Sequence, residues 1–162
     1  MQKLDSKAIW IFFGRYLLIG IIFGFIPVIY GIAMLERFFI INIEYIPGLL
    51  VVFVIAIALF AYIWARLAVH YYRYEFTDIA FKKEFGVIYK MYVSIPYERI
   101  QNVDIVRGIV ARLLGLSNLV IQTAGISGSV RAEGFLPGLS KEIAEQHRED
   151  LVRKIKSKNQ GL

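Results

Sequence analysis

Two long apolar stretches without a charged side chain constrain this chain more than any other feature. They cover residues 16–35 and 49–65. A hydrocarbon core about 30 Å thick is crossed by about 20 helical residues at about 1.5 Å each. Only helices and closed barrels satisfy every backbone polar group in lipid, and neither stretch alternates with a period of two. The sequence therefore predicts a membrane α-helical hairpin with spans over residues 10–35 and 47–69.

The rest of the chain has a different composition. Hydrophobic residues make up 57% of the whole sequence, and most of this excess lies in residues 1–69. Residues 70–162 carry 14 basic and 10 acidic side chains, interspersed as in an ordinary soluble domain. We therefore expect a two-helix transmembrane anchor over residues 1–69 and a cytoplasmic domain over residues 70–162. The chain has no cysteine, which excludes a disulfide framework and thiolate chemistry.

Basic residues set the expected orientation. Lys3 and Lys7 precede the first span and Arg73 follows the second, whereas only Arg37 lies in the connection. The positive-inside rule then predicts an integral protein of the cell membrane with both termini in the cytoplasm. A cleaved signal peptide is the competing interpretation, but the first apolar run is too long for it and lacks a cleavage site. Four residues near the span ends are predicted interfacial anchors: Trp10, Arg15, Trp64 and Arg66.

Small residues line one face of each predicted span. Gly20 and Gly24 form a GxxxG pair, with Gly31 one heptad further on. The second span places small residues at Ala58, Ala61 and Ala65. Small faces let helices approach closely. Either the glycine face receives the alanine face within one chain, which we favour, or it mediates homodimerisation.

Beyond residue 70 the hydrophobic pattern changes to a period of two, which is typical of strands. One predicted strand presents Tyr72, Tyr74 and Phe76 on one side, and another presents Val87, Tyr89, Met91, Val93 and Ile95. Further alternating runs cover residues 101–107, 117–124 and 129–135. Residues 140–156 predict a helix with Ser140 as N-cap and a face formed by Ile143, His147, Leu151 and Ile155. The fold class is therefore a mainly-β barrel or sandwich closed by a C-terminal amphipathic helix.

Short motifs in this region resemble those of a known family. The chain reads Ile-Pro-Tyr-Glu-Arg-Ile at 95–100 and Arg-Leu-Leu-Gly-Leu at 112–116, after Gly-Val-Ile at 86–88. Over residues 71–156 it resembles bacterial pleckstrin-homology-like (PH-like) membrane proteins, in which two transmembrane helices precede a PH-like domain. The resemblance implies this architecture and a domain that is not enzymatic.

The resemblance also directs attention to three lysines. PH-like domains elsewhere bind phosphoinositide headgroups through lysines around the first hairpin. Here Lys82 and Lys83 precede the Phe85-Gly86 turn, and Lys90 follows it. Each basic side chain at an anionic leaflet gains roughly 1 kcal/mol, so three would reinforce an anchored domain. The alternative is that they are solvated lysines of an edge strand, where they block edge pairing.

Four arginines form a second candidate anion-binding group: Arg99, Arg107, Arg112 and Arg131. Structural salt bridges with Glu98, Asp104 or Glu133 are the alternative role for at least two of them.

Two connecting segments carry apolar side chains for which the sequence allows two roles. Residues 108–116 predict a short helix whose Ile109, Val110, Leu113 and Leu114 either pack inward or touch lipid. The stretch Gly-Ile-Ser-Gly-Ser at 125–129 is a loop whose Ile126 either inserts into a membrane or partner or is simply solvated.

Catalysis finds no support in the sequence. The only histidines are His70 and His147, and no motif for a metal, a cofactor, a nucleophile elbow or a phosphate loop occurs. Mixed charges and the lack of an aromatic RNA-binding signature argue against nucleic acid. The function predicted is a membrane-anchored binding module that recognises anionic lipid or another membrane-associated ligand at the cytoplasmic face. The alternative is a protein-interaction or assembly module, as a homo-oligomer or with another membrane protein, without intrinsic lipid recognition.

Overall fold

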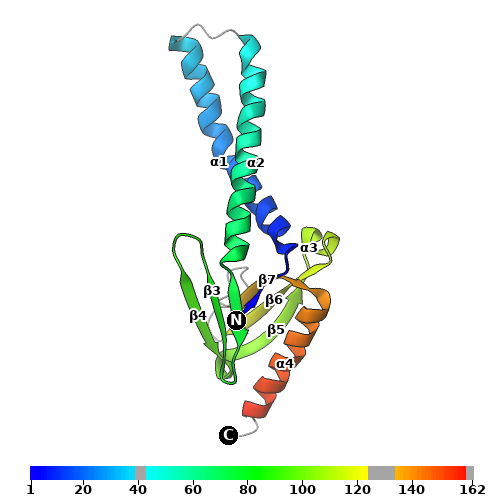
Figure 1. The fold of residues 1–162 in the computed structure, drawn as a ribbon. Helices are drawn as coiled ribbons and strands as arrows, with labels where there is room; N and C mark the ends of the chain where they lie inside the picture. The colour runs from blue at the N-terminus through cyan, green and yellow to red at the C-terminus, as the bar shows by residue number, and fades with distance from the viewer. Residues whose placement is uncertain (39–42, 124–133, 160–162) are drawn as a thin grey trace. The chain divides into compact units, whose positions relative to one another are not determined.

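The computed structural model describes residues 1–38, 43–123 and 134–159 of the 162-residue chain. Contacts divide the chain into two compact units (Figure 1). Met1–Ile11 and Ala68–Leu162 form the first, which we call the sheet unit. Phe12–Leu67 form the second, which we call the helical unit.

Two long helices supply the helical unit. Helix α1 covers Ala8–Phe38, and α2 covers Ile46–His70 after the short 3-10 helix η1 (Ile43–Tyr45). The 25 residues of α2 extend about 37 Å at about 1.5 Å per residue, more than the roughly 30 Å of a hydrocarbon core. Both helices are long and apolar enough to cross a membrane. The predicted spans therefore fall on helices of the required length.

Glycines of α1 lie against large side chains of α2. A Cβ built on Gly20 would lie 2.7 Å from Cγ2 of Ile57, and one on Gly24 would lie 3.1 Å from both Ile57 and Phe53. The close approach is therefore to Ile57 and Phe53, while Ala61 and Ala65 are buried elsewhere along α2. A Cβ on Gly31 would meet nothing within 4 Å among the described residues.

The sheet unit contains two antiparallel sheets. The first has the order β1-β2-β3-β4 and comprises β1 (Gln2–Lys3), β2 (Arg73–Phe76), β3 (Ala80–Phe85) and β4 (Met91–Pro96). The second has the order β5-β6-β7 and comprises β5 (Ile100–Val106), β6 (Leu116–Thr123) and β7 (Gly134–Ser140). The 3-10 helix η2 (Tyr97–Arg99) links the sheets, and α3 (Ile109–Leu113) links β5 to β6. The fold is thus an open two-sheet sandwich and not a closed barrel, as expected for a PH-like sandwich.

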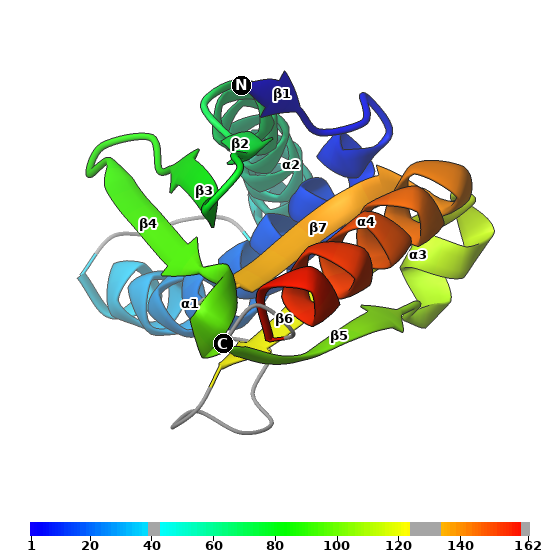
Figure 2. The same ribbon diagram turned by 90° about the horizontal axis from the view of Figure 1, so that it is seen from below.

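The last helix, α4 (Lys141–Asn159), packs against the second sheet (Figure 2). Ser140 Oγ accepts a hydrogen bond from the Ile143 backbone N–H at 3.3 Å, which confirms the predicted N-cap. Ala144 and Leu151 of α4 are buried, as are Leu119 and Leu136 of the sheet beneath it. Ile143 is exposed, so the prediction that it belongs to the packed face is wrong. The buried stripe instead begins one residue later, because that position faces the sheet.

The first residues of the chain join the first sheet. Gln2 lies opposite Tyr74 and Lys3 opposite Arg73, so β1 extends the sheet beyond β2. Leu4 and Ala8 are buried in the sheet unit. A two-residue strand carries no periodicity, so no sequence pattern indicates it.

Strand β7 contains a bulge that the sequence pattern conceals. Its register with β6 passes from Leu119 opposite Leu136 to Ser117 opposite Leu139, which leaves Pro137 and Gly138 facing a single residue. Gly138 has a φ of +65°, a conformation that glycine adopts without strain. The predicted strand at 129–135 lies mostly outside the described residues, whereas β7 runs to Ser140 through this Pro-Gly pair.

Candidate functional site

The turn between β3 and β4 contains more residues than the sequence predicts, and its backbone folds closely on itself at Gly86. Gly86 has a φ of +115°, and a Cβ there would lie 1.9 Å from the carbonyl oxygen of Tyr89. Strand β4 begins only at Met91, so the prediction of a strand from Val87 is wrong for its first four residues. Ile88 and Tyr89 instead occupy the turn, 72% and 85% exposed.

The two adjacent lysines of β3 have different environments, because successive side chains of a strand point to opposite faces. Lys82 is exposed, whereas Lys83 is only 6% exposed. Lys83 Nζ donates a hydrogen bond to the Phe135 carbonyl at 3.1 Å and lies 4.9 Å from the centre of the Phe85 ring. Lys83 therefore connects the first sheet to β7 of the second.

Tyr72 reinforces the same connection. Its hydroxyl donates to the Phe135 carbonyl at 2.9 Å, and its ring stacks on Phe85 with 5.7 Å between centroids. Burial raises the pKa of Tyr72 well above its ordinary value of 10.0, so the hydroxyl keeps its proton. Phe135 thus accepts two side-chain hydrogen bonds from the opposite sheet.

Lys90 lies at the end of the β3–β4 turn. Its Nζ forms an ion pair with Glu84 Oε1 at 3.3 Å and lies 5.9 Å from the centre of the Tyr71 ring. Tyr71 directly follows His70, the last residue of α2. The structure therefore places Lys90 beside the point where α2 ends, with Lys82 on the exposed face of β3 and Lys83 inside.

Two arginines of the second candidate group flank β5. Arg99 precedes this strand and Arg107 follows it, so seven strand residues at about 3.3 Å each separate them by about 25 Å. Arg107 Nε donates to the Leu116 carbonyl at 3.0 Å, which joins the two ends of the α3 connection. Arg112 is exposed on α3 itself. The structure therefore brings Arg107 and Arg112 to one connection and leaves Arg99 at the other end of the strand.

Of the expected carboxylate partners, Asp104 contacts two amides. Asp104 accepts hydrogen bonds from the side-chain amides of Asn102 and Gln122, at 3.0 and 2.8 Å. Arg131 and Glu133 lie outside the described residues, as does the 125–129 loop with Ile126.

Helix α3 presents its large apolar side chains outward. Ile109 is 72% exposed and Leu113 is 82% exposed, and Val110 is also exposed. Ala111 is the buried residue of this helix. Of the two alternatives for this segment, inward packing is excluded for Ile109, Val110 and Leu113.

His147 is partly buried on α4. Its Nε2 lies 3.5 Å from the Tyr74 hydroxyl, and its ring lies 4.6 Å from that of Phe76. Burial lowers the pKa of His147 below its ordinary value of 6.5, while the nearby Asp150 carboxylate acts in the opposite direction.

A hollow of about 370 Å³ opens beside His147. Its lining consists of Gln2, Phe76, Gln146, His147, Asp150, Leu151, Arg153 and Lys154. The charges here are already engaged, since Arg153 pairs with Asp150 at 3.1 Å and Lys154 donates to the Thr77 carbonyl at 3.0 Å. Within residues 1–38, 43–123 and 134–159, no group of three His, Cys, Asp or Glu side chains is placed to hold a metal ion.

The predicted interfacial residues lie along both helices. Trp10, Arg15 and Arg66 are exposed, and Trp64 is partly buried. The Trp64 ring stacks on Phe60 with 5.7 Å between centroids.

Comparison with known families decides the classification. The sequence pattern of the family described as Bacterial PH domain matches residues 15–156. The chain belongs to the bacterial PH domain family. The match covers β2 to β7 and most of both long helices, and it leaves β1 outside. No curated protein and no solved structure matches this PH domain protein.

Proposed function

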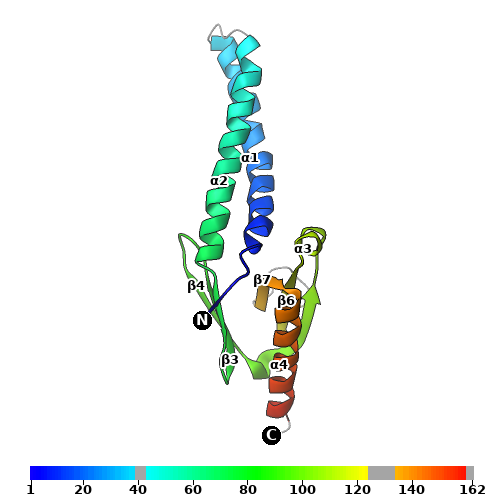
Figure 3. The ribbon, with the colours of Figure 1, turned by 45° about the vertical axis from the view of Figure 1, so that its right-hand side comes forward.

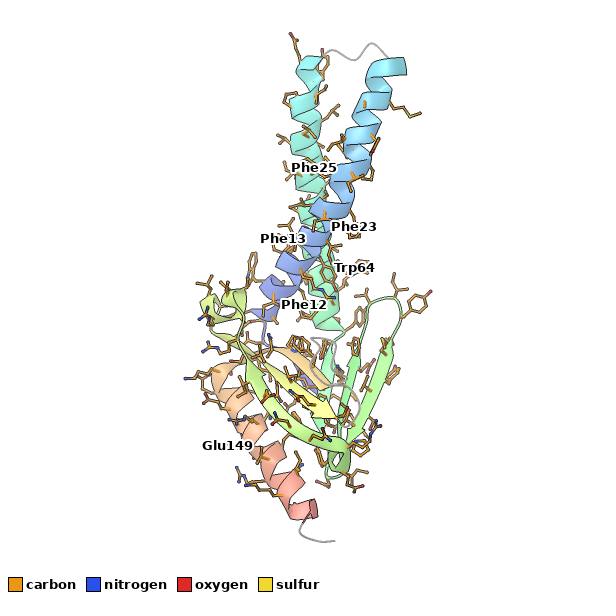
Figure 4. All side chains as sticks on the ribbon, turned by 180° about the vertical axis from the view of Figure 1, so that it is seen from behind. Phe12, Phe13, Phe23, Phe25, Trp64 and Glu149 are labelled. Atoms are coloured by element: carbon orange, nitrogen blue, oxygen red, sulfur yellow. The ribbon has the colours of Figure 1, made fainter. Side chains whose placement is uncertain are left out.

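We propose that this PH domain protein is a membrane-anchored binding module that recognises anionic lipid at the cytoplasmic face of the cell membrane. The observation that carries the proposal is the apolar outer surface of α1 and α2. Phe23 of α1, for example, is 72% exposed, and its ring points away from the helix (Figure 4). A soluble protein rarely exposes continuous apolar surface of this extent, whereas a bilayer core accommodates it.

The orientation proposed has both termini in the cytoplasm, with residues 1–69 as anchor and residues 70–162 as binding domain. Lys3, Lys7, Arg66 and Arg73 near the chain ends of the two helices support it through the positive-inside rule. In this orientation Trp10, Arg15, Trp64 and Arg66 lie at the cytoplasmic interface. The residues before α1 also contribute β1 to the binding domain, so an experiment needs the full chain.

Four basic side chains of the sheet unit are the proposed lipid contacts, of which Arg107 is partly buried and the other three are exposed. Lys82 and Lys90 supply charge from the first sheet, and Arg107 and Arg112 supply it from the α3 connection. Each gains roughly 1 kcal/mol near an anionic surface, and the Glu84 carboxylate reduces the contribution of Lys90. The proposed activity is therefore binding, with the helices supplying most of the attachment and the charges supplying lipid preference.

Lysine reactivity in the full chain tests this proposal. The protein is reconstituted in nanodiscs of phosphatidylcholine alone or mixed with phosphatidylglycerol, and amine-reactive labelling is quantified for each lysine by mass spectrometry. We expect Lys82 and Lys90 to be protected by the anionic lipid at low salt and to regain reactivity at high salt. Lys141, an exposed lysine at the start of α4, is the internal reference and is expected to react equally in all samples.

Equal labelling of Lys82 and Lys90 in neutral and anionic nanodiscs would contradict lipid recognition. The single charge reversals Lys82→Glu and Lys90→Glu extend the test, since each should reduce the difference in labelling between the two lipids at the lysine that remains of this pair. Loss of that difference in a Lys141→Glu control would mean that overall charge and not these positions is responsible.

Protein interaction is the second candidate, and strand β4 favours it. This strand is the outer member of the first sheet, and it exposes Met91 and Tyr92. An exposed edge with apolar side chains is suited to the addition of a partner strand. Partner binding that is indifferent to phosphatidylglycerol would support this candidate over lipid recognition.

A further inference from the structure

Two exposed apolar tips of the sheet unit are not used by the function proposed above. The first is the β3–β4 turn with Ile88 and Tyr89, and the second is α3 with Ile109 and Leu113. Large apolar side chains gathered at exposed tips commonly mark a membrane or protein contact. Their positions in the sheet unit decide which contact they suit.

The turn lies next to the end of α2. Tyr72, two residues after His70, stacks on Phe85 at the base of the turn. Lys90, at the other base of the turn, lies over the ring of Tyr71. The residues that flank the turn on both sides therefore contact the residues that directly follow α2.

Helix α3 lies at the end of the second sheet where β7 binds the residues just before α1. Leu116, just after α3, pairs with Ser140 at the end of β7. Gly138 of the same strand donates its N–H to Asn118 Oδ1 at 3.0 Å, and its carbonyl accepts the Asp5 N–H at 3.2 Å. Asp5 is three residues before Ala8, the first residue of α1. Both tips thus lie at the end of the sheet unit that carries the helix junctions, as Figures 1 and 3 show.

We propose that these two tips insert into the interfacial region of the bilayer that α1 and α2 span. This insertion fixes the orientation of the PH domain on the membrane. The proposal rests on the proposed function, in which both helices span that bilayer. Ile88, Ile109 and Leu113 bury apolar surface among the headgroups and upper acyl chains. Tyr89 suits the interface because its ring is apolar and its hydroxyl remains hydrated.

Charge at the tips agrees with a lipid surface. Lys90 follows the turn, Arg107 precedes α3, and Arg112 lies on α3 next to Leu113. These basic groups meet anionic headgroups while the apolar side chains lie deeper. The Glu84 carboxylate, near the end of β3 that leads into the turn, is paired with Lys90 at 3.3 Å.

The opposite end of β3 supplies a matched control. Ile79 is also an exposed isoleucine in a turn, 64% exposed, but it precedes β3 whereas Ile88 follows it. Six strand residues at about 3.3 Å each place the two turns about 20 Å apart. The inference assigns Ile88 to the membrane and Ile79 to the solvent, although both side chains have the same chemistry.

Single cysteines test the inference directly, because the chain has no cysteine of its own. Ile88→Cys, Leu113→Cys, Ile79→Cys and Phe23→Cys variants of the full chain are labelled with an environment-sensitive fluorophore. They are then reconstituted in vesicles of phosphatidylcholine and phosphatidylglycerol without any other protein. Quenching is measured with aqueous iodide and with doxyl-labelled lipid.

We expect the Ile88→Cys and Leu113→Cys labels to be quenched several-fold less by iodide than the Ile79→Cys label, and more by doxyl lipid. The Phe23→Cys label, on the outer face of α1, should show the strongest lipid quenching. If Ile88→Cys and Leu113→Cys are as accessible to iodide as Ile79→Cys while Phe23→Cys is shielded, the inference is overturned and the anchor stands. If Phe23→Cys is also accessible, the membrane anchor itself is overturned, and the inference with it.

Discussion

Gly138 and Ala8 touch so closely that a side chain at Gly138 has no room. A Cβ built on Gly138 would lie 2.4 Å from the Cβ of Ala8. Ala8 is completely buried, and Asp5 donates its N–H to the Gly138 carbonyl at 3.2 Å. The first residue of α1 and the segment before it therefore pack against the bulge of β7.

Gly138→Ala is expected to destabilise the sheet unit and release the N-terminal segment. The positive φ and the overlap with Ala8 together should cost about 2–3 kcal/mol. Thermal unfolding of the full chain in nanodiscs and proteolysis within residues 1–7 measure the two effects. Gly115→Ala is the control, since Gly115 has a φ of +71° but a Cβ there would meet nothing within 4 Å in the described part of the chain. Equal losses in the two variants would mean that the contact with Ala8 contributes nothing.

Lys83→Met and Lys82→Met should differ although the residues are neighbours. Lys83→Met removes a buried hydrogen bond to Phe135 and is expected to lower the free energy of unfolding by about 1–2 kcal/mol. Lys82→Met changes an exposed side chain and should stay within about 0.5 kcal/mol of the parent. Urea or thermal unfolding in the same nanodiscs provides the comparison. A stable Lys83→Met protein would argue against the role of Lys83 in joining the two sheets.

The stability of the sheet unit should fall in mild acid because of His147. Burial lowers the pKa of His147 in the folded chain below its ordinary value of 6.5, so the unfolded chain binds the proton more readily. The contribution of the neutral ring is complete above about pH 6.5 and is lost as the pH falls through the lower folded pKa. Unfolding midpoints measured between about pH 7.5 and 5.5 should therefore decrease less in His147→Gln than in the parent. An unchanged pH dependence in that variant would rule His147 out as the responsible group.

Gly20→Val and Gly31→Val test the packing of the helical unit. A Cβ at Gly20 would lie 2.7 Å from Ile57, so the larger side chain should separate α1 from α2 and cost about 1–3 kcal/mol. At Gly31 a Cβ meets nothing within 4 Å among the described residues, and the same substitution should be tolerated. Helix unfolding by SDS titration, followed by circular dichroism, ranks the two variants. Equal sensitivity would show that the glycine contact with Ile57 does not hold the helices together.

Local patterns made several elements predictable. The two spans follow from apolar runs of sufficient length. In a lipid environment apolar side chains are stabilised, and each backbone polar group needs a hydrogen bond within the helix. The start of α4 follows from Ser140, whose hydroxyl accepts the Ile143 N–H. Strand β6 shows the alternation expected of one buried face, with Leu119 and Ile121 inside.

The placement of the candidate site residues was less predictable. Lys82, Lys83 and Lys90 form one basic cluster by sequence, but the alternation of β3 turns Lys83 inward and an ion pair engages Lys90. Arg99 and Arg107 are close in sequence, yet the full length of β5 separates them. For apolar residues such as Ile109 and Leu113 the sequence does not distinguish a core position from a surface position, because the distinction depends on which segments pack around them.

The sequence by itself determined the two apolar helices, the mainly-β character of the remainder and the amphipathic last helix, because each depends on composition and spacing within a few turns or strands. Only the tertiary structure decided that β1 joins β2, that Pro137 and Gly138 form a bulge, and that Gly138 receives Ala8. It also decided that Ile88 and Leu113 face outward. These features depend on strand register and on contacts between segments that are far apart in the sequence, several of them separated by more than 60 residues. No local pattern of side chains encodes such contacts.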